Sequence, residues 1–128
     1  MSKVASESAN IKIKALKSML KVQEEKLISE MLNYKNLKSV LMQKKQNVHS
    51  YQNELINLKN TACAGRKIKM FIQYLEVKEK IKAEIYLVSA TQNMIKESSL
   101  NIKWLKKQIN TTNKNLNKLN VIDEEAKI

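Results

Sequence analysis

The sequence predicts an all-α protein, a long antiparallel two-helix coiled-coil hairpin. The chain of 128 residues has no proline and one glycine, so it lacks the turn residues that a sheet-containing protein of this size needs. Only 5% of its residues are aromatic, which favours long helices with a narrow apolar seam over a bulky core. A seven-residue apolar repeat runs through both halves of the chain, and such a repeat is typical of coiled coils.

The first helix is expected at about residues 10–60. With Ile13 taken as position a, every a residue up to Leu55 is apolar, and so are most residues at position d. The a residues are Ile13, Leu20, Leu27, Tyr34, Leu41, Val48 and Leu55. Residues 1–9 are small, polar and without a period, which predicts a flexible N-terminal tail.

The second helix is expected at about residues 66–122, where the repeat resumes. Its a residues are Tyr74, Ile81, Val88, Ile95, Ile102, Ile109 and Leu116. The turn is predicted at residues 60–66, because Gly65 can adopt the left-handed conformation that ends a helix. Residues 123–128 are predicted to form an acidic C-terminal tail. One continuous helix that dimerises through the same seam is the alternative.

Polar residues interrupt the d positions of both predicted helices. Lys44 and Glu84 are both d residues, and in an antiparallel hairpin they fall in adjacent layers, where they are expected to pair. Polar residues in a seam lower stability and help to fix the register.

The charge balance is strongly basic, with 24 Lys+Arg against 12 Asp+Glu and a net charge of +12. Lysine dominates, and Arg66 is the one arginine, so the sequence lacks the arginines that nucleic-acid readers use. A basic balance allows nucleic acid, anionic lipid or an acidic protein partner, and it does not choose among them. The single arginine counts against nucleic acid.

No pattern of catalytic, cofactor-binding or metal-binding residues is recognisable. His49 lies at a b position and is interpreted as a solvated surface residue, and the lone Cys63 as a small residue of the turn. The sequence therefore predicts a protein that is not an enzyme and takes no cofactor, metal or small-molecule substrate. No segment has signal-peptide character or approaches ~18 apolar residues, so a cytoplasmic location is expected.

Two surfaces are candidates for binding other proteins. The first lies at the end away from the turn, where two lysine-rich segments without acidic residues meet around Trp104, a c residue outside the seam. Its members are Lys12, Lys14, Lys17, Lys103, Trp104, Lys106 and Lys107. The alternatives are a merely solvated lysine surface and a Trp104 side chain that folds over the edge of the seam.

The second candidate surface lies beside the turn. It is a stripe of apolar residues outside the seam with basic neighbours, which is typical of a protein-binding site. Its members are Arg66, Lys67, Ile68, Phe71, Ile72 and Leu75. The alternative is a local shift in register that turns these side chains inward.

Two stretches resemble a known family: Ile102-Lys103-Trp104-Leu105-Lys106-Lys107 and the acidic Asp123-Glu124-Glu125. They are similar to the central-stalk proteins of type III secretion systems, the flagellar FliJ and injectisome SctO proteins, and within these to the invasion-type branch. The chain is shorter than typical flagellar members.

The resemblance implies a stalk that couples ATP hydrolysis to protein export without catalysing it. The implied partners are a hexameric secretion ATPase, the cytoplasmic part of an export-gate membrane protein, and secretion chaperones. The implied location is the cytoplasmic side of the inner-membrane secretion apparatus. A helical-hairpin secretion chaperone and a nucleic-acid-binding coiled coil are the alternatives.

Overall fold

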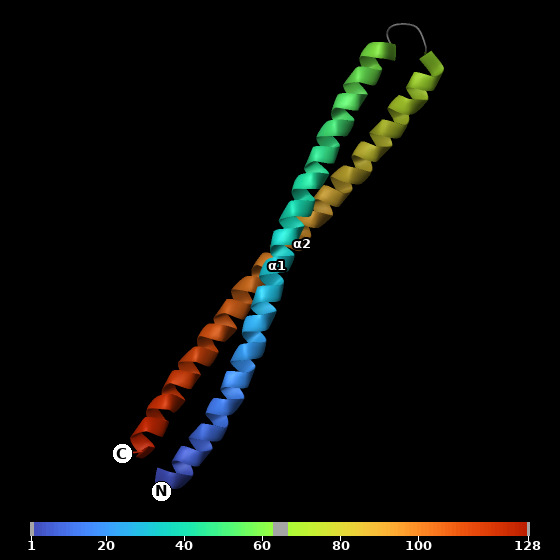
Figure 1. Cartoon of the computed structure of the whole chain (residues 1–128). Helices are drawn as coiled ribbons and strands as arrows, with labels where there is room; N and C mark the ends of the chain where they lie inside the picture. Colours follow the sequence, from blue (N-terminus) through green and yellow to red (C-terminus); the bar gives the residue numbers. More distant parts are fainter. Residues whose placement is uncertain (1, 63–66, 128) are drawn as a thin grey trace. The chain divides into compact units, whose positions relative to one another are not determined.

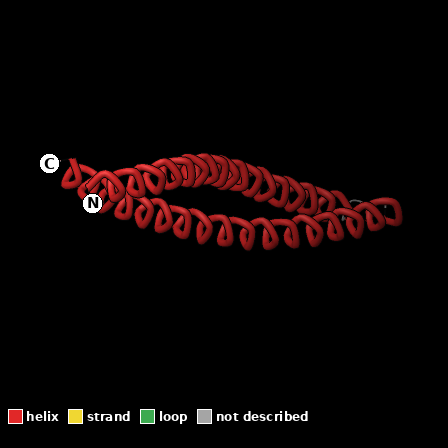
Figure 2. The backbone as a smooth tube through the Cα atoms, turned by 90° about the horizontal axis from the view of Figure 1, so that it is seen from below, coloured by secondary structure: helices red, strands yellow, loops and turns green. Residues whose placement is uncertain are grey.

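The computed structural model describes the backbone of residues 2–62 and 67–127 and the side chains of residues 7–60 and 68–125. It contains two helices, α1 (Ser2–Ala62) and α2 (Lys67–Lys127). The helices pack against each other in opposite directions, so the predicted all-α hairpin is confirmed and the continuous helix is wrong (Figures 1 and 2).

The chain divides into two units, each of which is an antiparallel pair of helical segments. We call residues 1–33 and 98–128 the terminal unit, and residues 34–97 the loop unit. Each unit takes one segment from α1 and one from α2. The two segments of the terminal unit are distant in sequence, whereas the loop unit is one continuous stretch.

The seam of the hairpin follows the predicted heptad register in both units. Every a and d residue from Ala9 to Leu58, and from Met70 to Asp123, is buried or half-buried, whereas most other described side chains are exposed. A two-helix pair can cover only this stripe of each helix, because the remaining surface of each helix has no neighbour.

The helices extend further at both ends than the sequence analysis predicted. Residues 2–9 are helical rather than a tail, and Ala9 is a buried d residue one heptad before Leu16. Residues 123–127 are also helical, and Asp123 is a buried a residue one heptad after Leu116. The seam therefore continues through residues that are small or polar and carry little periodic signal.

The predicted turn at 60–66 begins too early, because α1 continues to Ala62. Alanine has the highest helix propensity of all residues, which accounts for this extension. Cys63, Gly65 and Arg66 lie outside the described residues.

Small hydroxyl residues occupy several d positions of α2. The Thr91 hydroxyl donates a hydrogen bond to the Leu87 carbonyl oxygen at 2.7 Å. The Thr112 hydroxyl lies 2.9 Å from Gln23 Oε1 and 3.0 Å from the Gln108 carbonyl oxygen, and it shares its one proton between these acceptors. The Ser98 hydroxyl is buried and has no hydrogen-bond partner among the described residues.

Candidate protein-binding surfaces

Trp104 lines a groove between α1 and α2 in the terminal unit. The opposite wall of the groove is formed by Met19, Val22 and Lys26 of α1. Gln108 lies about one turn after Trp104 on α2. The indole is 59% exposed. The Trp104 side chain therefore lies at the edge of the seam, as one predicted alternative has it. It still exposes more than half of its surface, as the predicted binding surface requires.

A second groove in the same unit lies closer to the chain ends. Leu16 and Leu119 contribute to its wall, with Lys12 and Ile122 beside them. Both grooves are lined largely by residues at c, d and g positions. In an antiparallel pair the g positions of the two helices flank the same side of the seam, so both grooves open on one side of the terminal unit.

The lysines predicted to surround Trp104 do not form one patch with it. Each helical residue is rotated by about 100° from the previous one, so the Lys106 side chain leaves α2 about 200° from Trp104. Lys14, Lys17 and Lys103 occupy b or e positions, as Lys106 does, and are exposed on the opposite side of the seam. Lys107, three residues after Trp104, is exposed near the Trp104 side.

The apolar stripe beside the turn is exposed. Ile68, Phe71, Ile72 and Leu75 have exposed fractions of 45% to 78%, so the predicted alternative in which they turn inward is wrong. Lys67 is the first residue of α2 and its side chain is outside the described residues, as is Arg66.

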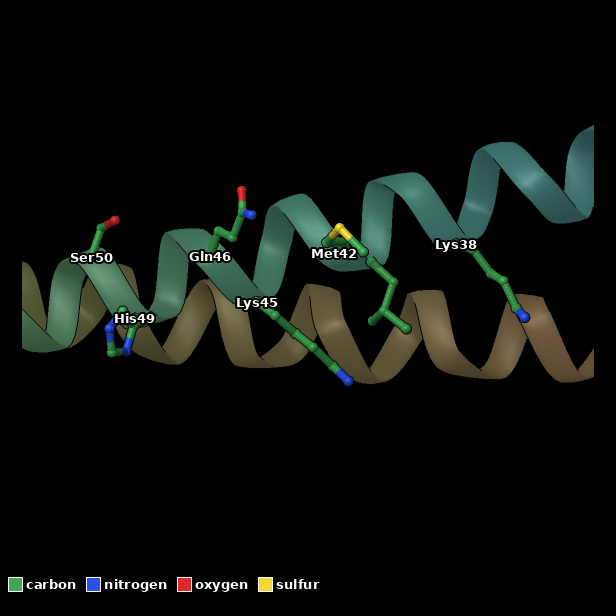
Figure 3. A pocket seen from close by; sticks show the side chains of 7 residues that line it. Lys38, Met42, Lys45, Gln46, His49 and Ser50 are labelled. Carbon is green, nitrogen blue, oxygen red and sulfur yellow. The ribbon is translucent and has the colours of Figure 1, made fainter.

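A third groove was missed by the sequence analysis. It lies on α1 in the loop unit and holds about 740 Å³, with Leu41 and Met42 as its apolar members. Figure 3 shows Lys38, Lys45 and His49 extending to one side of α1, while Gln46 and Ser50 point to the other. The signal was present in the sequence, because Met42 and His49 share the b position with Ile56 one heptad later.

Within the described part of the chain, no three side chains of the types His, Cys, Asp and Glu gather closely enough to hold a metal ion. None of the described helical stretches combines the length and the apolar character that crossing a bilayer requires. The features that the structure does show are grooves and exposed apolar stripes on the two helices.

We compared the chain with protein-family models, curated proteins and solved structures, and none of them matches it.

Proposed function

We propose that this protein is the central stalk of a type III secretion ATPase, which links the ATPase hexamer to the export gate and promotes protein export without catalysing a reaction itself. The observation that carries the proposal is the terminal unit, where an exposed Trp104 groove lies on one side of the seam and a group of lysines on the other. The resemblance of residues 102–107 and 123–125 to the stalk family supports the same role.

The two sides of the terminal unit suit two steps of association. Lys14, Lys17, Lys103 and Lys106 can accelerate encounter with an acidic surface, although at ~0.15 M salt their field is screened beyond roughly 8 Å. Trp104 can then hold the complex, because buried tryptophans are among the strongest anchors of protein interfaces. In the stalk role, this surface contacts the central opening of the ATPase ring.

The loop unit supplies the second contact in this proposal. The exposed Ile68, Phe71, Ile72 and Leu75 bind the cytoplasmic part of the export gate, and secretion chaperones are further partners. The protein would then lie in the cytoplasm, peripheral to the inner-membrane apparatus.

The experiment compares stimulation of the purified secretion ATPase by the parent chain and by variants of the terminal unit. Trp104→Ala should speed dissociation by roughly thirtyfold, as expected for an anchor worth about 2 kcal/mol. Its matched control is Leu100→Ala, because Leu100 is an equally exposed apolar residue of the same segment of α2 and should have little effect. Equal stimulation by the parent chain and Trp104→Ala would contradict the proposed contact.

The lysine contribution is tested by replacing Lys17, Lys103 and Lys106, which lie on the side opposite Trp104, with Glu. This variant should associate more slowly with the ATPase and depend less on salt, because the lysines act mainly on the encounter rate. Its helix content, measured by circular dichroism, should remain that of the parent, since all three lysines are exposed. An unchanged association rate would show that these lysines are merely solvated.

A helical-hairpin secretion chaperone is a second candidate, and the exposed apolar grooves of the terminal unit favour it. Stoichiometry separates the two roles. A stalk binds as one copy per ATPase hexamer, whereas a chaperone binds as one copy per exported substrate, and the mass of the purified complex distinguishes these.

A further inference from the structure

The two sides of the seam in the loop unit differ sharply in charge. The b and e positions of both helices flank one side, which we call the b/e face, and the c and g positions flank the other. No Asp or Glu occupies a b or e position among the described side chains 34–60 and 68–97, whereas Glu54, Glu76 and Glu97 occupy c or g positions. The lysines of the b/e face are Lys35, Lys38, Lys45, Lys59, Lys78, Lys82 and Lys96.

Little inside the loop unit neutralises these lysines. Glu79, at a bordering f position, lies 3.4 Å from Lys82, and both side chains are largely exposed, so solvent screens this pair. The ammonium groups of Lys38 and Lys78 lie 4.7 Å and 5.2 Å from the ring centroids of the tyrosines four residues before them. These ring contacts leave the positive charge of both lysines in place.

The b/e face also carries large apolar side chains that are exposed. They are Met42, Ile56, Ile68, Phe71, Leu75 and Ile85. Lysines alone at these positions would form an ordinary solvated surface. Exposed apolar residues among them remain in contact with water, and their burial would be favourable.

Two contacts between α1 and α2 relate the levels of their residues to within about one helical turn. Lys44 Nζ is 3.6 Å from Glu84 Oε2, and Lys80 Nζ is 5.9 Å from the centroid of the Tyr51 ring. The counts from these two contacts differ by three residues, so Met42 of α1 lies within about one helical turn of the level of Ile85 of α2.

The same counting from Tyr51 and Lys80 places Ile56 at the level of Leu75, five residues nearer the turn on each helix. The exposed apolar residues thus form two clusters. The inner cluster contains Met42 and Ile85, and the outer cluster contains Ile56, Phe71 and Leu75.

A basic belt lies between the two clusters. Lys45 of α1 and Lys78 and Lys82 of α2 occupy b or e positions between these levels, and His49 lies among them. Beside the inner cluster, the Leu41–Met42 groove is bordered by Lys38 and Lys45, whose side chains extend to the same side of α1 (Figure 3). The order along the face is therefore apolar, basic, apolar.

We propose that the b/e face of the loop unit binds an amphipathic α-helix of a partner protein, with two apolar anchors separated by acidic residues. Met42 and Ile56 are fourteen residues apart on α1, a distance of about 21 Å or four helical turns. A partner helix of roughly twenty residues spans both clusters, with its acidic residues over the basic belt.

This inference shares Phe71 and Leu75 with the proposed export-gate contact, and it goes beyond the stalk role because it adds Met42, Lys45, His49 and Ile85, which that role leaves unused. It also holds for any partner that presents such a helix. A nucleic acid fits the face less well, because apolar clusters interrupt the path of its phosphates and no described residue of the face is an arginine. A flat lipid surface fits less well than a helix, which can lie between two helices.

The test uses the full chain and a synthetic helical peptide of 21 residues, with leucine anchors at both ends and glutamates between them. A second peptide has glutamine in place of the leucines and the same charge. The leucine peptide should bind at least tenfold more tightly in fluorescence anisotropy at ~0.15 M salt, because only it fills the apolar clusters. Equal binding of the two peptides would overturn the proposal in favour of nonspecific charge attraction.

The chain offers a matched pair of variants for this face. Met42 is 65% exposed on the b/e face, and Met94 is 52% exposed at a g position on the opposite side of the same unit. Met42→Glu should weaken binding of the leucine peptide about tenfold, and Met94→Glu should leave it within twofold. Lys45→Glu on the b/e face and Lys69→Glu at an exposed c position on the opposite side form a second pair with equal change in net charge. Equal losses within either pair would overturn the proposal.

Methionine-methyl NMR locates the bound peptide directly. The Met42 methyl resonance should shift on addition of the leucine peptide, and the Met94 resonance should not. Phosphatidylserine vesicles and a short DNA duplex are added separately under the same conditions. If either of these shifts the Met42 resonance and the leucine peptide does not, the face serves a membrane or a nucleic acid and the proposal is wrong.

Discussion

Replacing Lys44 with leucine tests whether the seam depends on the ion pair that crosses it. The ammonium and carboxylate groups are 3.6 Å apart, and the side chains of Lys44 and Glu84 are 30% and 15% exposed. Removing one partner of a fully buried pair costs about 3–5 kcal/mol, because a charge is left without compensation. Water reaches Lys44, so we expect Lys44→Leu to lower the free energy of unfolding by about 1–3 kcal/mol.

The double variant Lys44→Leu, Glu84→Leu completes the experiment. It places two apolar residues in the seam and leaves no unpaired charge, so its stability should equal or exceed that of the parent. The assay is urea denaturation followed by circular dichroism, because urea is uncharged and does not screen the ion pair as a guanidinium salt does. If the coupling energy from the double-mutant cycle is within about 0.3 kcal/mol of zero, the pair contributes no specific interaction and the argument fails.

Three further variants probe the packing of the terminal unit in the same assay. Leu105 is 6% exposed, so Leu105→Ala should cost about 2–5 kcal/mol, whereas Leu100→Ala, at a residue 64% exposed, should change stability by less than about 0.5 kcal/mol. Equal effects at the two sites would show that the terminal unit is not packed through its d positions. Ser98→Ala should raise stability by about 1 kcal/mol, because it removes a buried hydroxyl that has no partner among the described residues and improves helix propensity. A loss of stability would mean that the hydroxyl has a partner.

The sequence was sufficient to predict the hairpin and its seam. A helix in a two-helix pair buries residues at a spacing of about 3.5, and Leu, Ile, Val and Tyr mark that spacing in both halves of the chain. The Lys44–Glu84 pair followed from the same register and is confirmed. It was visible because both residues break an apolar series at d positions, where an unpaired charge is costly.

The helix ends and the grouping of site residues were harder to predict. Ala9 and Asp123 complete the seam, but a single methyl group and a carboxylate give no hydrophobic signal. Trp104 and Lys106 are close neighbours in sequence, and the helical rotation between them places them on opposite sides of the seam. The Leu41–Met42 groove depends on atomic packing around α1, which the order of residues alone does not describe.

The pairing of Gln23 with Thr112 has a consequence for synthesis of the chain. The hydrogen bond between these side chains joins residues separated by 89 positions. At 5–20 residues per second, a ribosome needs about 4 to 18 s to make Thr112 after Gln23. During that time the apolar stripe of the first helical segment has no partner segment to pack against. Only 40 further residues separate Lys44 from Glu84, so that pair can form much earlier. The entropic cost of closing the chain is also lower for the Lys44–Glu84 pair, because fewer residues lie between its members. Assembly should therefore begin beside the turn and proceed toward the chain ends.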